Sequence, residues 1–106
     1  MLEIYPVIVS LVEGMGLVLK EVAKHDGDLA RQGRRAVLSI LLNVKEGMGS
    51  DKGNREARYF NALGSAGESR ACLQLARARY GIEVSAQLWD QLDHVIAVLW
   101  KLTRKK

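Results

Sequence analysis

The chain contains a single proline, Pro6, which leaves nearly all of its 106 residues free to form helix. Apolar residues recur along it at spacings of three and four, which is the period of an amphipathic α-helix. No segment shows the alternation of apolar and polar residues that is typical of a strand. The sequence therefore predicts an all-α fold.

The hydrophobic period divides the chain into four helices, over about residues 3–25, 29–46, 55–80 and 86–103. Gly27 and Gly81 are expected to end the first and third helices, and Asp28 and Ser85 to cap the second and fourth. The glycine-rich segment 47–54 is expected to connect the second and third helices, since its spacing does not match a phosphate-binding loop. These short connections predict a single domain over residues 1–106, folded as an up-down-up-down antiparallel four-helix bundle.

Each predicted helix has one apolar row that is expected to face the core. The rows are Ile4, Ile8, Leu11, Met15, Val18 and Val22; Leu29, Gly33, Ala36, Val37, Ile40, Leu41 and Val44; Tyr59, Ala62, Ala66, Ser69, Leu73, Ala76 and Tyr80; and Leu88, Leu92, Val95, Leu99 and Leu102. A second row of the third helix contains Gly64 and Gly67, and we expect it to let a neighbouring backbone approach closely. Glu68, on the same helix, is expected to be buried and paired with Arg34 or Arg35.

Four large apolar residues lie outside these core rows. Leu38 and Leu42 interrupt the basic side of the second helix, and Trp89 and Trp100 flank the core row of the fourth. A four-helix bundle needs only one buried stripe per helix, and tryptophan favours the centres of protein interfaces. We therefore predict a homo-oligomer in which Leu38, Leu42, Trp89 and Trp100 lie at the subunit interface.

Charge is unevenly distributed along the chain, whose net charge is +4. Residues 1–30 sum to −3, residues 31–79 to +6 and residues 80–106 to +1. The arginine-rich middle suits the recognition of phosphate or carboxylate groups, although a solvated helix surface would have a similar composition. The candidate binding residues are Arg31, Arg34, Arg35, Lys45, Lys52, Arg55, Arg58, Arg70 and Arg77, with the terminal Arg104, Lys105 and Lys106 as an addition.

The residues that could do chemistry are few and poorly spaced. His25 and His94 form no metal-ligand pair, and Cys72 lies in a small-residue helix that suits an inert buried thiol. Asn43 and Glu46 are interpreted as partners for the backbone amides of segment 47–54. We expect no enzymatic activity, no metal and no cofactor. We also expect a cytoplasmic protein that does not enter a membrane, because no apolar run is long enough to cross one and the start of the chain does not resemble a signal peptide.

Two runs of residues resemble a known family. The run from Arg34 to Gly47, RRAVLSILLNVKEG, is similar to the "RRAxxSIxxNIxEG" signature of bacterial four-helix bundle proteins that are encoded in intervening sequences of 23S rRNA genes. The run from Ala62 to Glu68, ALGSAGE, resembles the second signature of that family, "AxGSxxE". Together the two runs cover about a fifth of the chain.

The resemblance implies a four-helix bundle related in fold to the accessory variability determinant of diversity-generating retroelements. That protein forms a five-subunit ring and binds a reverse transcriptase and nucleic acid. The resemblance thus implies a homopentamer whose arginine-rich surface binds RNA, DNA or a reverse transcriptase. The alternative is a purely structural or adaptor oligomer in which the same arginines form ion pairs between subunits.

Overall fold

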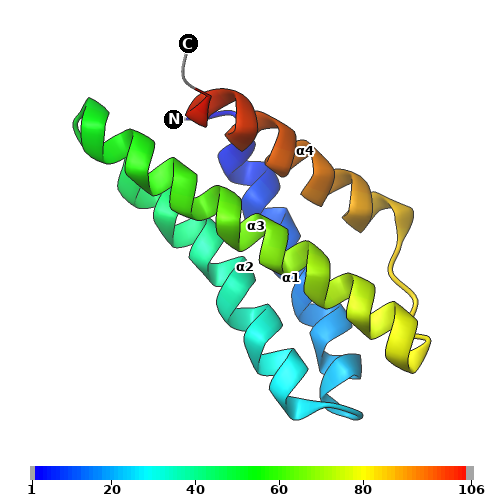
Figure 1. The fold of residues 1–106 in the computed structure, drawn as a ribbon. Coiled ribbons are helices and arrows are strands. Elements are labelled where there is room, and N and C mark those ends of the chain that lie inside the picture. The colour runs from blue at the N-terminus through cyan, green and yellow to red at the C-terminus, as the bar shows by residue number, and fades with distance from the viewer. Residues whose placement is uncertain (1, 105–106) are drawn as a thin grey trace.

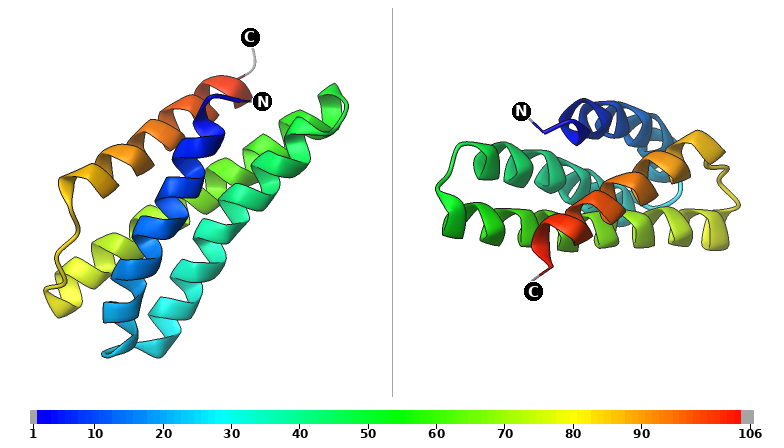
Figure 2. Two further views of the ribbon diagram at one scale, coloured as in Figure 1. Left: turned by 180° about the vertical axis from the view of Figure 1, so that it is seen from behind. Right: turned by 90° about the horizontal axis from the view of Figure 1, so that it is seen from above.

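A computed structural model describes residues 2–104, which form four helices and no strand. The helices are α1 (Ile4–Ala23), α2 (Gly27–Met48), α3 (Lys52–Tyr80) and α4 (Ala86–Thr103). Consecutive helices run in opposite directions, and each packs on two neighbours, in the cyclic order α1, α2, α3, α4 (Figures 1 and 2). The α1–α4 seam and the α2–α3 seam therefore lie on opposite sides of the molecule. The predicted all-α fold of four helices is confirmed.

The turn between α1 and α2 differs from the prediction. Asp26, with an extended backbone at φ −154°, is the N-cap of α2, and its Oδ1 accepts a 3.0 Å hydrogen bond from the amide of Leu29. Gly27 is already the first residue of α2, and the positive φ expected there is absent. The prediction of Asp28 as the cap was wrong because α1 ends at Ala23 and the turn is only three residues long, so Asp28 falls in the first turn of α2.

The connection between α2 and α3 is shorter than predicted. α2 continues to Met48, and Asp51 caps α3 by accepting a 3.1 Å hydrogen bond from the amide of Asn54. Most of segment 47–54 is therefore helical, because the Asp51 cap outweighs the low helix propensity of Gly53. At the other end of α3, Gly81 has φ 65°, and Ser85 caps α4 by accepting a 3.1 Å hydrogen bond from the amide of Leu88. The roles predicted for Gly81 and Ser85 are confirmed.

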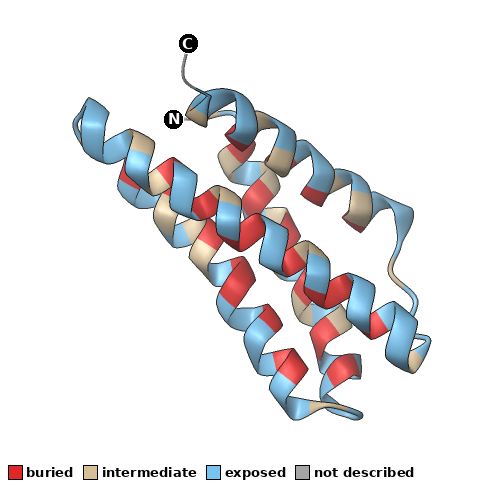
Figure 3. Ribbon diagram, in the orientation of Figure 1, coloured by how far each residue is buried: buried red, intermediate tan, exposed pale blue. Residues whose placement is uncertain are grey.

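The core lies between the inward faces of the four helices (Figure 3). Its largest fully buried side chains are Ile8, Leu11, Met15, Leu19, Ile40, Leu73, Leu92 and Leu99. Four predicted core positions are not fully buried: Val18, Leu41 and Tyr80 are only partly buried, and Leu102 is exposed. On α1, Leu19 is fully buried beside the partly buried Val18, because the buried stripe follows the 3.6-residue period of the helix. Leu102 is 37% exposed, because the last turn of α4 lies at the end of the bundle (Figure 1).

Within residues 2–104, every helix is too short or too polar to cross a lipid bilayer.

Candidate functional site

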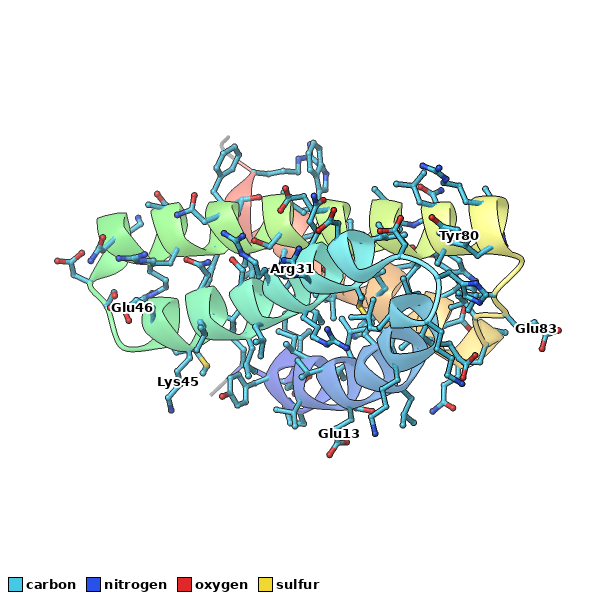
Figure 4. The ribbon with its side chains drawn as sticks, turned by 90° about the horizontal axis from the view of Figure 1, so that it is seen from below. Glu13, Arg31, Lys45, Glu46, Tyr80 and Glu83 are labelled. Atoms are coloured by element: carbon cyan, nitrogen blue, oxygen red, sulfur yellow. The ribbon has the colours of Figure 1, made fainter. Side chains whose placement is uncertain are left out.

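The nine candidate cations fall into three groups. Arg31, Arg34 and Arg35 lie on the outer side of α2; Lys45, Lys52, Arg55 and Arg58 lie around the α2–α3 turn; and Arg70 and Arg77 lie at the α3–α4 seam. The first two groups follow one another along the paired helices α2 and α3, and Figure 4 shows Lys45 pointing away from the bundle. Six of the nine predicted residues therefore share the α2–α3 side. Lys45 lies at the α1 edge of α2, with Nζ 5.9 Å from the ring centroid of Tyr5, and Arg70 and Arg77 belong to the α3–α4 seam.

Few of these cations are neutralised within the chain. Among residues 2–104, Arg31 forms an ion pair with Asp28, and Nε of Arg70 lies 2.9 Å from Oδ1 of Asp93. The other seven form no ion pair with a carboxylate in that part of the chain. The α2–α3 side thus presents five cations whose charge no described carboxylate offsets through an ion pair.

The third group surrounds a tryptophan. The guanidinium carbons of Arg70 and Arg77 lie 5.4 and 5.3 Å from the ring centroid of Trp89, and such cation–π contacts favour a fixed arrangement. Trp89 is partly buried and packs on the core, so its own chain already covers much of the ring. Trp100, in contrast, is 55% exposed. Of the two tryptophans predicted at a subunit interface, only Trp100 leaves most of its surface uncovered.

A groove follows the α2–α3 seam. One part, of about 450 Å³, is lined by Arg35, Leu38, Leu42, Glu46 and Arg58, and a second part, of about 550 Å³, includes Arg35, Ser39, Glu68, Cys72 and Leu75. Arg35 and Ser39 line both parts, so the groove is continuous. Leu38 and Leu42 are 45% and 64% exposed at its edge. The structure therefore places the predicted interface leucines and two of the predicted binding arginines around one depression.

A small hydrogen-bond network forms the base of this groove. Nδ2 of Asn43 donates to the carbonyl and to Oγ of Ser39 at 2.9 and 3.0 Å, and Oγ of Ser65 donates to Oγ of Ser39 at 2.7 Å. Within residues 2–104 no backbone amide of segment 47–54 donates to the Asn43 side chain, so the interpretation of Asn43 as a partner for that segment was wrong. Sequence reasoning missed this network, although Ser39 and Asn43 have the i, i+4 spacing at which helical side chains meet.

Two further predictions on α3 were wrong. Glu68 is exposed, and among residues 2–104 it forms no ion pair with Arg34 or Arg35, since its position on α3 faces the open groove. Gly64 and Gly67 are exposed as well, and no atom of a neighbouring element lies within 4 Å of the Cβ that either would carry. Their row faces away from the core, so no backbone of this chain approaches it.

The described residues hold few groups suited to catalysis. Burial, and then the nearby Glu68 carboxylate, raise the pKa of the Cys72 thiol, which disfavours the nucleophilic thiolate. Within residues 2–104, His, Cys, Asp and Glu side chains do not gather in threes that could hold a metal ion. What the arrangement offers instead is a row of cations beside exposed leucines, which can bind an anionic or apolar surface.

The comparisons with known proteins give one result. A family model described as 23S rRNA-intervening sequence protein matches residues 2–101, which include both signature runs, the whole of α1, α2 and α3, and all but the last two residues of α4. No curated protein sequence and no solved structure matches the chain.

Proposed function

Because this chain belongs to the 23S rRNA-intervening sequence protein family, we propose that it is a non-enzymatic homo-oligomer that binds nucleic acid through the cations of its α2–α3 side. One observation carries this proposal: five cations of that side form no ion pair with a described carboxylate. They are Arg34, Arg35, Lys52, Arg55 and Arg58.

The arrangement of these cations suits a phosphate backbone. Arg35 lies 13 residues, or about 20 Å, before the end of α2, and Lys52, Arg55 and Arg58 lie beyond the turn, so the five cations extend over several phosphates of a nucleic acid strand. Arginine presents a planar fork of donors that matches phosphate oxygens, and four of the five cations are arginine. Contacts of this kind bind the backbone irrespective of sequence, so we expect weak discrimination between sequences.

A salt titration tests the proposal. Fluorescence anisotropy of a labelled single-stranded RNA and of a DNA duplex should show binding at about 50 mM salt, and the affinity should fall steeply as salt rises. The triple variant Arg34→Gln, Lys52→Gln, Arg55→Gln should bind at least about tenfold more weakly, with a salt slope smaller by about 2 for single strands. The matched control is Lys20→Gln with Lys101→Gln, which removes exposed cations from α1 and α4 and should change binding little.

Each outcome of this titration has a clear meaning. Absence of binding to both nucleic acids at about 50 mM salt would reject the proposal. An equal loss of nucleic-acid affinity in the triple variant and in the control would show that the α2–α3 side is not the binding surface. If the triple variant lost assembly instead, the cations would serve subunit contacts, as in the alternative of a structural or adaptor oligomer.

The exposed apolar residues support the oligomeric part of the proposal. Leu38 and Leu42 on α2 are 45% and 64% exposed, and Trp100 on α4 is 55% exposed; exposed large apolar side chains of this kind are typical of faces that another molecule covers. From the fold resemblance we propose a ring of five subunits, and a reverse transcriptase as an additional partner. Native mass spectrometry measures the subunit number directly, and a monomer at about micromolar concentration would reject this part.

A further inference from the structure

A second groove lies on the opposite side of the bundle, along the α1–α4 seam. It has a volume of about 450 Å³, equal to that of the Leu38–Leu42 part of the α2–α3 groove. Its charged lining residues are Glu13 and Glu83, without a lysine, arginine or histidine, and Leu17 at its edge is 70% exposed. Figure 4 shows Glu13 projecting from the outer side of α1 and Glu83 from the segment between α3 and α4. We call this depression the acidic groove.

The part of the α2–α3 groove lined by Arg35, Leu38, Leu42, Glu46 and Arg58 has the complementary character, and we call it the basic groove. Its arginines outnumber its single carboxylate, and its exposed leucines correspond to Leu17 of the acidic groove. One chain therefore has, on opposite sides, two depressions of equal volume, similar apolar content and opposite charge.

We propose that the acidic groove of one copy docks on the basic groove of the next copy, so that the subunits associate head to tail. This inference rests on the homo-oligomer of the proposed function and names its two contacting faces. It assigns Arg35 and Arg58 to the subunit contact and leaves Arg34, Lys52 and Arg55 to the proposed nucleic-acid binding. Contacts between identical grooves would place Glu13 near Glu83, or Arg35 near Arg58, across the interface, and such like-charge pairs are unfavourable. Contacts between unlike grooves pair each carboxylate with a guanidinium and bring Leu17 against Leu38 and Leu42.

The dimensions of the molecule allow this contact. The bundle measures 42 × 23 × 23 Å, so each long side presents roughly 970 Å². A stable interface covers about 800 Å² of each partner. Each copy offers both grooves, so the contact repeats from subunit to subunit until a ring closes, or extends as a filament where the rotation does not close.

A second copy of this chain would account for both the acidic groove and the basic groove, whereas a different partner would account for only one of them. Any partner of the basic groove must present acidic groups beside an exposed apolar side chain. The acidic groove of this chain provides that combination at equal size and at equal concentration. Leu38 and Leu42, which the sequence places outside the core, and Leu17 then share one explanation.

Charge exchange between the grooves provides the test. Variant A carries Glu13→Arg and Glu83→Arg, variant B carries Arg35→Glu and Arg58→Glu, and variant AB carries all four changes. Light scattering coupled to size-exclusion chromatography should show that A and B each dissociate at protein concentrations at least 100-fold above those at which the wild type dissociates. Variant AB restores opposite charges on the two faces and should assemble.

Other results overturn the inference. Loss of assembly in B together with normal assembly of A would show that the basic groove pairs with itself. Normal assembly of both A and B, or a variant AB that is folded by circular dichroism and yet monomeric, would reject charge pairing between the grooves. Variant A keeps all the cations of α2 and α3, so anisotropy with A measures nucleic-acid binding independently. The experiment thereby distinguishes failure of the docking between subunits from failure of the proposed nucleic-acid binding.

Discussion

The phenol of Tyr80 donates a 2.7 Å hydrogen bond to Oδ2 of Asp26, and so joins the last residue of α3 to the turn between α1 and α2. The other oxygen of the same carboxylate, Oδ1, accepts the 3.0 Å hydrogen bond from the amide of Leu29 that caps α2. The ring of His25 stacks on that of Tyr80, with 5.4 Å between the centroids. The Asp26 carboxylate thus caps the start of α2 and also links it to the end of α3, next to the end of α1.

Removing this carboxylate should destabilise the protein more than removing the phenol. Asp26→Ala eliminates the α2 cap and leaves the Tyr80 hydroxyl without its partner, whereas Tyr80→Phe removes only the hydrogen bond. Urea unfolding followed by circular dichroism should give midpoints in the order wild type, Tyr80→Phe, Asp26→Ala, from highest to lowest. Asp28→Ala is the control, because this residue has no capping role and its ion pair with Arg31 is exposed and contributes little, so its midpoint should stay close to that of the wild type.

The same pair predicts how stability depends on pH. The hydrogen bond from the Leu29 amide, and then that from Tyr80, hold the pKa of Asp26 below its usual value, so its contribution is present above about pH 4 and is lost as pH falls through the lowered pKa. The Asp26 carboxylate raises the pKa of Tyr80, whose contribution is present below about pH 10 and is lost as pH rises through the raised pKa.

Urea midpoints measured across the pH range test both directions. In Tyr80→Phe the alkaline loss attributable to Tyr80 should vanish, while part of the acid loss should remain, because the Leu29 amide still bonds to Asp26. An acid loss of unchanged size in Asp26→Asn would contradict this assignment.

The helical layout could be predicted because it depends on local pattern. The three-four spacing of Leu88, Leu92, Val95 and Leu99 places all four in the core, and Ser85 and Gly81 have the residue types that helix ends require. The ends of α2 were less predictable. Either Asp26 or Asp28 could serve as a cap, and the choice depends on where α1 stops, which packing decides.

The candidate site was less predictable because it depends on which helix faces meet. Sequence pattern identified Leu38 and Leu42 as lying outside the core, but it could not place Arg58 of α3 beside them. It also paired Glu68 with an arginine of α2, although the residue faces an open groove. The side of the bundle on which each cation lies depends on how its helix is rotated about its own axis. Amino-acid composition does not determine that rotation.

Two kinds of glycine in this chain should respond oppositely to alanine. Gly47 is buried, and a Cβ there would contact the buried ring of Tyr59, with Cδ1 only 2.8 Å away, so Gly47→Ala should cost about 1–3 kcal/mol through overpacking. Gly64 lies exposed within α3 with open space around it, so Gly64→Ala should stabilise by about 0.5–1 kcal/mol. Urea unfolding of the two variants measures both signs, and destabilisation by Gly64→Ala would indicate that another chain covers this row.

Cys72 should react slowly with thiol reagents in the folded protein. It is 7% exposed, and burial together with the Glu68 carboxylate raises its pKa, so little thiolate is available at neutral pH. Reaction with a chromogenic disulfide should be much slower in buffer than in denaturing urea. Glu68→Gln should accelerate the reaction slightly, because it removes the smaller of the two causes. Equal rates in buffer and in urea would contradict the buried position of the thiol.

The contacts of Arg70 and Arg77 with Trp89 should stabilise the α3–α4 seam. Each guanidinium lies over the indole at 5.3–5.4 Å, and a partly exposed cation–π contact contributes about 0.5–1 kcal/mol. Arg77→Gln should therefore cost about that amount. In a double-mutant cycle, Trp89→Leu should reduce the cost of Arg77→Gln to near zero, since the aromatic partner is then absent.

Fluorescence gives a second measure of the same contact. In a Trp100→Phe background Trp89 is the only tryptophan, so the emission reports on its ring alone. Removing both arginines should shift this emission to longer wavelength as water reaches the indole, whereas Lys101→Gln, at an exposed position of α4, should leave it unchanged. An unshifted spectrum in the double arginine variant, together with an unchanged urea midpoint, would show that neither guanidinium shields the ring in solution. Arg70 and Arg77 would then be free to bind an anionic partner.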